Sequence, residues 1–165
     1  MRSGIGLFKG KIFLSAVTLF LASVQFSVSA KGEDSNLEGK EDAVMTFKSE
    51  SHDLAIEIQG KRHFLALNKI QHWDVEVAQI DGEAFSEVEM VFDGGMPSHG
   101  HGMPTTPKVM KQTDSVFVIK GIKFSMPGVW ELYFDIKRGD TNVRLTLEIE
   151  LHYGKKLKIL SARFS

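Results

Sequence analysis

The sequence contains no cysteine and only four prolines among its 165 residues. Without cysteine the fold uses no disulfide, and any soft metal ligand has to be a methionine thioether instead of a thiolate. The hydrophobic core must therefore hold the fold together without covalent links. A chain of this length suffices for one domain with a sizeable core.

Several catalytic signatures are also missing. The sequence has no cysteine nucleophile, no paired-carboxylate signature and no glycine-rich nucleotide loop after a strand. Ser98 directly precedes His99, but neighbours in sequence rarely align as nucleophile and base. We therefore expect a protein that is not an enzyme.

Residues 1–30 have the layout of a signal peptide, with basic residues, an apolar run from Ile12 to Ala22 and no acidic residue. A cleavage site at Val28-Ser29-Ala30 predicts an exported, periplasmic protein. The alternative is an uncleaved segment that anchors the chain, although the run is shorter than the ~20 residues of a spanning helix. No cysteine follows the run, which excludes lipid attachment through cysteine.

Removal of this segment changes the charge of the chain. It takes away three of the 20 Lys and Arg residues and none of the 21 acidic ones, which leaves a net charge of −4. A negative chain argues against a nucleic-acid partner. Residues 31–42 are rich in Gly, Glu, Asp, Ser and Lys and predict a flexible linker to a domain of residues 43–165.

From Ala43 onward, apolar residues recur at every second position, which is typical of strands with one buried face. Turn sequences separate these runs, and Arg138-Gly139-Asp140 between two long runs predicts a hairpin. The other predicted turns are Asp81-Gly82, Asp93-Gly94-Gly95 and Pro127-Gly128. The alternating residues are Met45 and Phe47; Leu54, Ile56 and Ile58; Trp73, Val75 and Val77; Val88, Met90 and Phe92; Val116 and Val118; Trp130, Leu132, Phe134 and Ile136; and Val143, Leu145, Leu147, Ile149 and Leu151.

No run of ten or more residues in the mature chain shows a helical stripe. The pattern therefore predicts an all-β fold, an immunoglobulin-like antiparallel β-sandwich of seven or eight strands. A closed barrel is the alternative. Trp73 and Trp130 lie in alternating runs, so we expect both indoles in the core.

The stretch from Met96 to Pro104 concentrates residues that can bind metal. His99 and His101 are two positions apart, and in extended backbone such residues project to the same side. Met96 and Met103 bracket them, and imidazole with thioether suits copper better than magnesium, calcium or zinc. The predicted metal ligands are His99, His101, Met96, Met103 and Met126, with Met110 and an oxygen of Asp93 as further candidates. Since imidazole ligands must be neutral, affinity should fall as the pH drops through about 6.

The same loop has a purely structural interpretation. Histidines beside glycine and proline often bond to backbone carbonyls and shape a turn, and a methionine at a strand end often fills a gap in the core. The remaining histidines are scattered singly, which is typical of surface residues; they are His52, His63, His72 and His152.

Two motifs resemble a known family. They are GGMPSHGHGMPTTP at 94–107 and GIKFSMPGVWEL at 121–132, with Asn68-Lys69 ahead of Trp73-Asp74-Val75. Together they closely resemble the YtkA-like domain, which is related to FixH-like proteins, over about residues 62 to 150. The resemblance implies a small exported or membrane-tethered sandwich, with some relatives linked to copper supply for haem-copper oxidases. Many relatives carry His where this chain has Ser125, which would leave Met126 alone at that part of a site.

Two functions follow as expectations. The first is a periplasmic copper-binding or copper-delivery module that uses the His/Met loop. The second is a structural or protein-interaction domain of an envelope complex, in which the loop is a structural clasp. Membrane contact is expected only through an uncleaved N-terminal segment.

Overall fold

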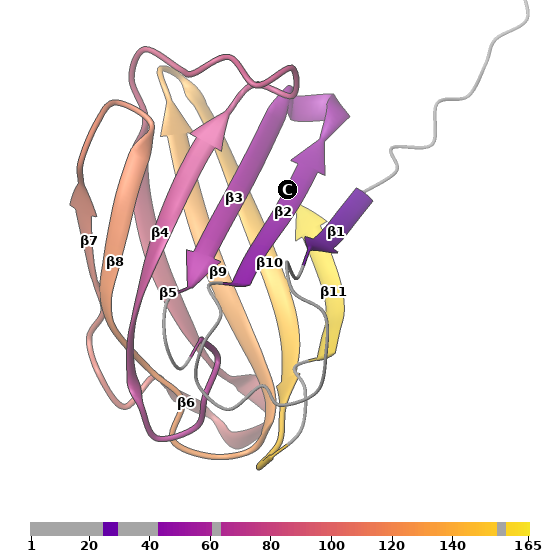
Figure 1. Ribbon diagram of the computed structural model, residues 1–165, viewed down its shortest axis with the longest axis vertical. Coiled ribbons are helices and arrows are strands. Elements are labelled where there is room, and N and C mark those ends of the chain that lie inside the picture. Colours follow the sequence, from indigo (N-terminus) through magenta and orange to yellow (C-terminus); the bar gives the residue numbers. More distant parts are fainter. Residues whose placement is uncertain (1–24, 30–42, 61–63, 155–157) are drawn as a thin grey trace, which may run out of the picture.

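The computed structural model describes residues 25–29, 43–60, 64–154 and 158–165. These ranges hold eleven strands and two three-residue 3₁₀ helices, η1 (Glu50–His52) and η2 (Pro97–His99), and no α-helix. Figure 1 shows the strands in two layers that pack face to face. The predicted all-β sandwich is confirmed.

Every neighbouring pair of strands is antiparallel. The six-stranded sheet has the order β1 (Gln25–Ser29), β2 (Ala43–Ser49), β3 (Leu54–Gly60), β4 (Ile70–Ala78), β8 (Val116–Lys123) and β7 (Lys108–Lys111). The five-stranded sheet has the order β11 (Lys158–Phe164), β10 (Thr141–Leu151), β9 (Gly128–Arg138), β5 (Glu89–Met96) and β6 (His101–Gly102).

Large aromatic side chains fill the core between the sheets. Trp73 on β4 and Trp130 on β9 are both 0 % exposed, as predicted. Phe124 lies between them, with its ring centroid 6.1 Å from that of Trp73 and 5.1 Å from that of Trp130. This aromatic row joins the two sheets at the end of the sandwich where β5, β6 and β9 meet.

The predicted hairpin at residues 138–140 is confirmed. Arg138 and Thr141 are the last paired residues of β9 and β10, so the turn has Gly139 and Asp140 at its centre. Gly139 has φ 55°, a left-handed conformation that glycine adopts without steric cost. The turn fixes a register that places Asp135 opposite Arg144.

The predicted turn at Asp93-Gly94-Gly95 is wrong, because β5 continues through both glycines to Met96. A Cβ on Gly94 would lie 2.9 Å from the carbonyl oxygen of Glu131, and one on Gly95 would lie 2.7 Å from that of His101. The glycines therefore allow close approach of neighbouring backbone and are not there to turn the chain.

The buried face of β8 also differs from the prediction. Val116 and Val118 were expected to face the core, but the buried side chains are Phe117 and Ile119, at 2 % and 0 % exposure. Both faces of this strand are apolar, so alternation alone does not select one. Val118 lies on the outer face, opposite Met110 of the edge strand β7.

The N-terminal predictions fall mostly outside the described residues. Gln25–Ser29 belong to the predicted signal peptide, and they form β1, which pairs with β2. The rest of that peptide and the predicted linker at 31–42 lie outside the described ranges. Among the described residues, no helix has the length and apolar character needed to cross a membrane.

Candidate functional site

The His/Met loop is a tight hairpin at one end of the sandwich. Strands β5 and β6 pair through Gly95 with Gly102 and Met96 with His101. Between them η2 turns the chain, and the amide of Gly100 donates to the carbonyl of Pro97 at 3.1 Å. Gly100 has φ 69°, which favours glycine. The expectation of extended backbone across His99 and His101 is therefore wrong, because a left-handed residue separates them.

The two imidazoles nevertheless lie close together. Their ring centroids are 6.0 Å apart with an interplanar angle of 55°, and both side chains are exposed. Nδ1 of His101 lies 2.9 Å from the carbonyl oxygen of Gly102. A carbonyl only accepts, so this contact places a proton on Nδ1 and leaves Nε2 of the neutral ring with a free lone pair.

His101 also contacts the core. It lies directly opposite Met96 in the register, and opposite residues project to the same face of a sheet. The exposed imidazole consequently lies over the end of the sandwich, and its centroid is 6.1 Å from that of Trp130 in an edge-on contact. The indole of Trp130 donates from Nε1 to the carbonyl oxygen of Met126 at 3.1 Å. The segments 96–104 and 124–132 thus meet around one tryptophan.

The three methionines of the predicted ligand set differ in burial. Met96 is 0 % exposed, and its Cε lies 2.8 Å from the position that a Cβ on Gly128 would occupy. Met103 and Met126 are partly buried and pack against the core. Met96 is therefore a core side chain, and only His99 and His101 of the five predicted ligands are exposed.

The further candidates lie elsewhere. Met110 is 43 % exposed on the outer face of the six-stranded sheet, away from the hairpin. The carboxylate of Asp93 accepts the amide proton of Gly94 at 2.8 Å. Within the described ranges no group of three or more His, Cys, Asp and Glu side chains could hold a metal ion. An ion at the hairpin would therefore need a ligand beyond the two histidines, such as a thioether.

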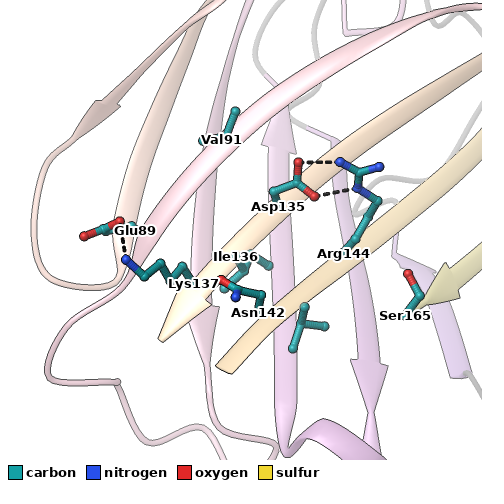
Figure 2. Close-up of a pocket in the computed structure, with 9 residues that line it drawn as sticks. Glu89, Val91, Asp135, Ile136, Lys137, Asn142, Arg144 and Ser165 are labelled. Carbon is teal, nitrogen blue, oxygen red and sulfur yellow. Dashed lines mark hydrogen bonds and ion pairs between the residues drawn. The ribbon is translucent and has the colours of Figure 1, made fainter. Parts of the chain in front are cut away.

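A second surface feature was not predicted. Figure 2 shows a depression on the outer face of the five-stranded sheet, with a volume of about 380 Å³, where side chains of β5, β9 and β10 meet. Arg144 donates two hydrogen bonds to Asp135, from Nε to Oδ1 at 2.5 Å and from Nη2 to Oδ2 at 2.7 Å. The hydrogen bond from Arg144 lowers the pKa of Asp135. Nearby, Lys137 Nζ lies 3.6 Å from Glu89 Oε2.

The carboxylates of Asp135 and Glu89 in this depression are thus each paired with a basic side chain. The signal for the Asp135–Arg144 pair was present in the hairpin at Arg138-Gly139-Asp140, because residues equally distant from a two-residue turn pair across it. Counting outward from that turn would have placed Arg144 opposite Asp135.

A hydrogen-bonded tyrosine–glutamate pair lies on the same outer face of the five-stranded sheet, nearer the His/Met hairpin. The hydroxyl of Tyr133 donates to Glu131 Oε2 at 2.5 Å, and this bond raises the pKa of Tyr133 to about 12. Asp93 lies opposite Tyr133, and Glu148 lies opposite Glu131. The tyrosine proton is therefore held among carboxylates.

Comparison of the chain with protein-family models, with curated proteins and with solved structures finds no match. The resemblance to the YtkA-like domain stays a prediction that rests on the two motifs alone.

Proposed function

We propose that this protein is an exported, non-catalytic β-sandwich that binds copper through His99 and His101. The observation that supports this is the 6.0 Å separation of two exposed imidazole rings on one tight turn. With metal–nitrogen bonds of about 2.0–2.1 Å, each ring centroid lies roughly 3.2 Å from the ion. Two rings on one ion are then at most about 6.4 Å apart, and the observed separation is within this limit.

The orientation of His101 favours a ligand role. Its Nδ1 contact with the carbonyl oxygen of Gly102 selects the tautomer in which Nε2 is free. Metal-binding histidines usually make such a bond through the second ring nitrogen, because it fixes the ring and raises its basicity. The tight turn around Gly100 also holds the imidazole of His99 beside that of His101.

Thioethers complete the proposed ligand set. Met103 follows His101 by two residues, and its amide donates to the carbonyl of Gly94 at 3.0 Å, which keeps this segment extended alongside β5. Residues two apart in extended backbone share a face, so the Met103 sulfur is the nearest soft donor in sequence. Met126 is the second choice, because its backbone already contacts Trp130. Imidazole with thioether suits Cu(I) in particular.

The decisive experiment is a titration of the purified protein with Cu(I) and Cu(II) against a competing chromophoric chelator. The parent should bind one ion, and the His99→Ala/His101→Ala variant should lose at least about tenfold in affinity, since two ligands are removed. The matched control, His52→Ala/His72→Ala, removes two histidines elsewhere and should bind as the parent does. Equal affinity of the parent and the loop variant would refute this site.

One observation favours a second function, a structural clasp in an envelope interaction domain. His101 bonds to Gly102 and packs on Trp130, so the loop side chain closes the end of the core without any metal. In that case His101→Ala should lower the melting temperature of metal-free protein clearly. Gly100→Val should also lower it, because φ 69° strains a β-branched residue. Unchanged melting temperatures in both variants would exclude the clasp.

A further inference from the structure

The chain has no cysteine, so its sulfur chemistry belongs to seven methionines. Six of them lie in the described ranges, and their side chains differ in access to solvent. Met110 is 43 % exposed and is, among these six, the one thioether side chain with a large surface in solvent. The other five are Met45, Met90 and Met96, which are at most 8 % exposed, and Met103 and Met126, which are partly buried against the core.

Met110 lies on the edge strand β7, on the outer face of the six-stranded sheet. Val118 lies opposite it on β8, and Val109, the preceding residue of β7, packs against the core. Successive side chains of a strand point to opposite faces, so the Met110 side chain points away from the core. Because β7 is an outermost strand, Met110 has a neighbouring strand of its sheet on one side only. A small dissolved molecule therefore reaches this side chain without any opening of the fold.

Peroxides oxidise a thioether in a two-electron step. The sulfur lone pair attacks one oxygen of hydrogen peroxide, so that an S–O bond forms and the O–O bond breaks. The hydroxide that leaves takes the proton of the sulfur-bound hydroxyl, and the products are one methionine sulfoxide and one water. The oxidant has to touch the sulfur, so exposed methionines react before buried ones. The indoles, which also oxidise, belong to Trp73 and Trp130 and are both 0 % exposed.

The surroundings of Met110 are compatible with a sulfoxide. A sulfoxide is polar and disrupts a core, whereas at Met110 it stays in contact with water. Lys108 lies two residues earlier on β7 and therefore shares this face. It is exposed, and its ammonium group forms no ion pair or hydrogen bond within the described part of the chain, so it is free to donate to the sulfoxide oxygen. Oxidation of Met110 should thus preserve the fold, unlike oxidation of the fully buried Met96.

We infer that Met110 is a reversible oxidation site of the folded protein, which takes oxygen from a peroxide before the other five described methionines do. While the oxidant is limiting, this reaction spares the thioethers of Met103 and Met126 at the hairpin. The exposed sulfoxide is accessible to a methionine sulfoxide reductase, which restores the thioether as two thiols become a disulfide and the oxygen leaves as water. The inference rests on exposure and is independent of copper binding.

Methyl NMR of protein with ¹³C-labelled methionine follows each thioether separately. A chelator removes metal ions, hydrogen peroxide is added in limiting amount, and single leucine substitutions assign the signals of the six described methionines. The Met110 signal should be replaced by a sulfoxide signal at least about tenfold faster than the signals of Met45 and Met96 are. It should also be replaced before those of Met103 and Met126. Earlier or equally fast loss of either of these two signals would overturn the inference.

Matched variants and reversal complete the test. In Met110→Leu the limiting oxidant should pass to Met103 and Met126, whereas Met103→Leu should leave the rate at Met110 unchanged. Protein oxidised at Met110 alone should keep the melting temperature of the parent, and methionine sulfoxide reductases with dithiothreitol should restore the Met110 signal. A clear fall in melting temperature, or a sulfoxide that the reductases do not reduce in the folded protein, would contradict a reversible site.

Discussion

The edge of the His101 imidazole meets the indole of Trp130, with ring centroids 6.1 Å apart and an interplanar angle of 72°. The histidine is exposed and the tryptophan is 0 % exposed, so the contact connects the hairpin to the hydrophobic core. Trp130 in turn bonds to the backbone of Met126 and packs on Phe124. A change at the hairpin tip should therefore alter the environment of one specific indole.

This contact predicts an optical signal for copper. Cu(II) bound at His101 should quench the fluorescence of Trp130, because the imidazole centroid is 6.1 Å from the indole centroid and the ion would lie only about 3.2 Å from the imidazole centroid. The sequence has two tryptophans, so the Trp130→Phe variant reports on Trp73 alone. Fluorescence titration should show strong quenching in the parent and in Trp73→Phe, and much weaker quenching in Trp130→Phe. Equal quenching in both single-tryptophan variants would place the ion elsewhere.

Gly128 is predicted to be sensitive to substitution because of its backbone conformation. It has φ 126°, which is essentially restricted to glycine, and a Cβ here would lie 2.8 Å from the Cε of Met96. Gly128→Ala should lower the free energy of unfolding by about 2–4 kcal/mol through backbone strain and crowding. Chemical denaturation measures this loss.

Gly139 provides the matched control for that substitution. It also has a positive φ, 55°, but nothing lies within 4 Å of a Cβ built on it. Gly139→Ala should therefore cost only about 1 kcal/mol, the strain of a left-handed alanine. Similar losses at the two positions would show that neither the φ of 126° nor the contact with Met96 adds to the cost at Gly128.

The strands that the sequence did not reveal are all at sheet edges. The seven alternating runs correspond to β2, β3, β4, β5, β8, β9 and β10, whereas β1, β6, β7 and β11 are the outermost strands. An edge strand is paired on one side only and is kept short or charged to prevent further pairing. Strand β6 has two residues, and two of the four residues of β7 are lysines. Such segments lack the apolar alternation that identifies an interior strand.

The candidate site could be located from the sequence but not assembled from it. Loop composition identified His99 and His101, yet the burial of Met96 follows from the continuation of β5 through both glycines, which places Met96 on the same buried face as Phe92. Glycine pairs usually indicate turns, and only the approach of the Glu131 and His101 carbonyls explains Gly94 and Gly95 as strand residues. These are consequences of tertiary packing, which local patterns do not encode.

Tyr133 gives a pH-dependent prediction. Its hydrogen bond to Glu131 raises the pKa of Tyr133 to about 12, above the usual value of 10.0. The folded state thus holds the proton more tightly, and this contribution to stability is complete below pH 10 and lost as the pH rises towards 12. Because the side chain is partly exposed, we expect a small effect, below about 1 kcal/mol.

Absorbance at 295 nm measures the ionisation directly. The sequence has two tyrosines, Tyr133 and Tyr153. The phase near pH 12 should disappear in Tyr133→Phe and persist in Tyr153→Phe, while circular dichroism at each pH verifies that the protein remains folded. Glu131→Gln should shift the Tyr133 phase to lower pH, because the acceptor loses its charge. If Glu131→Gln leaves the Tyr133 phase at the same pH, the hydrogen bond to Glu131 is not the cause of the raised pKa.

The methionines of the hairpin should divide into a core residue and a copper ligand. Met96 is 0 % exposed, so Met96→Leu should retain Cu(I) affinity and cost less than about 1.5 kcal/mol of stability, as volume-conserving core changes do. Met103→Leu keeps the apolar contact with the core but removes a soft donor beside His101, so Cu(I) affinity should fall while Cu(II) affinity changes little. Chelator competition for each oxidation state measures both effects. If Met96→Leu, and not Met103→Leu, weakens Cu(I) binding, the hairpin must open its core to bind the ion.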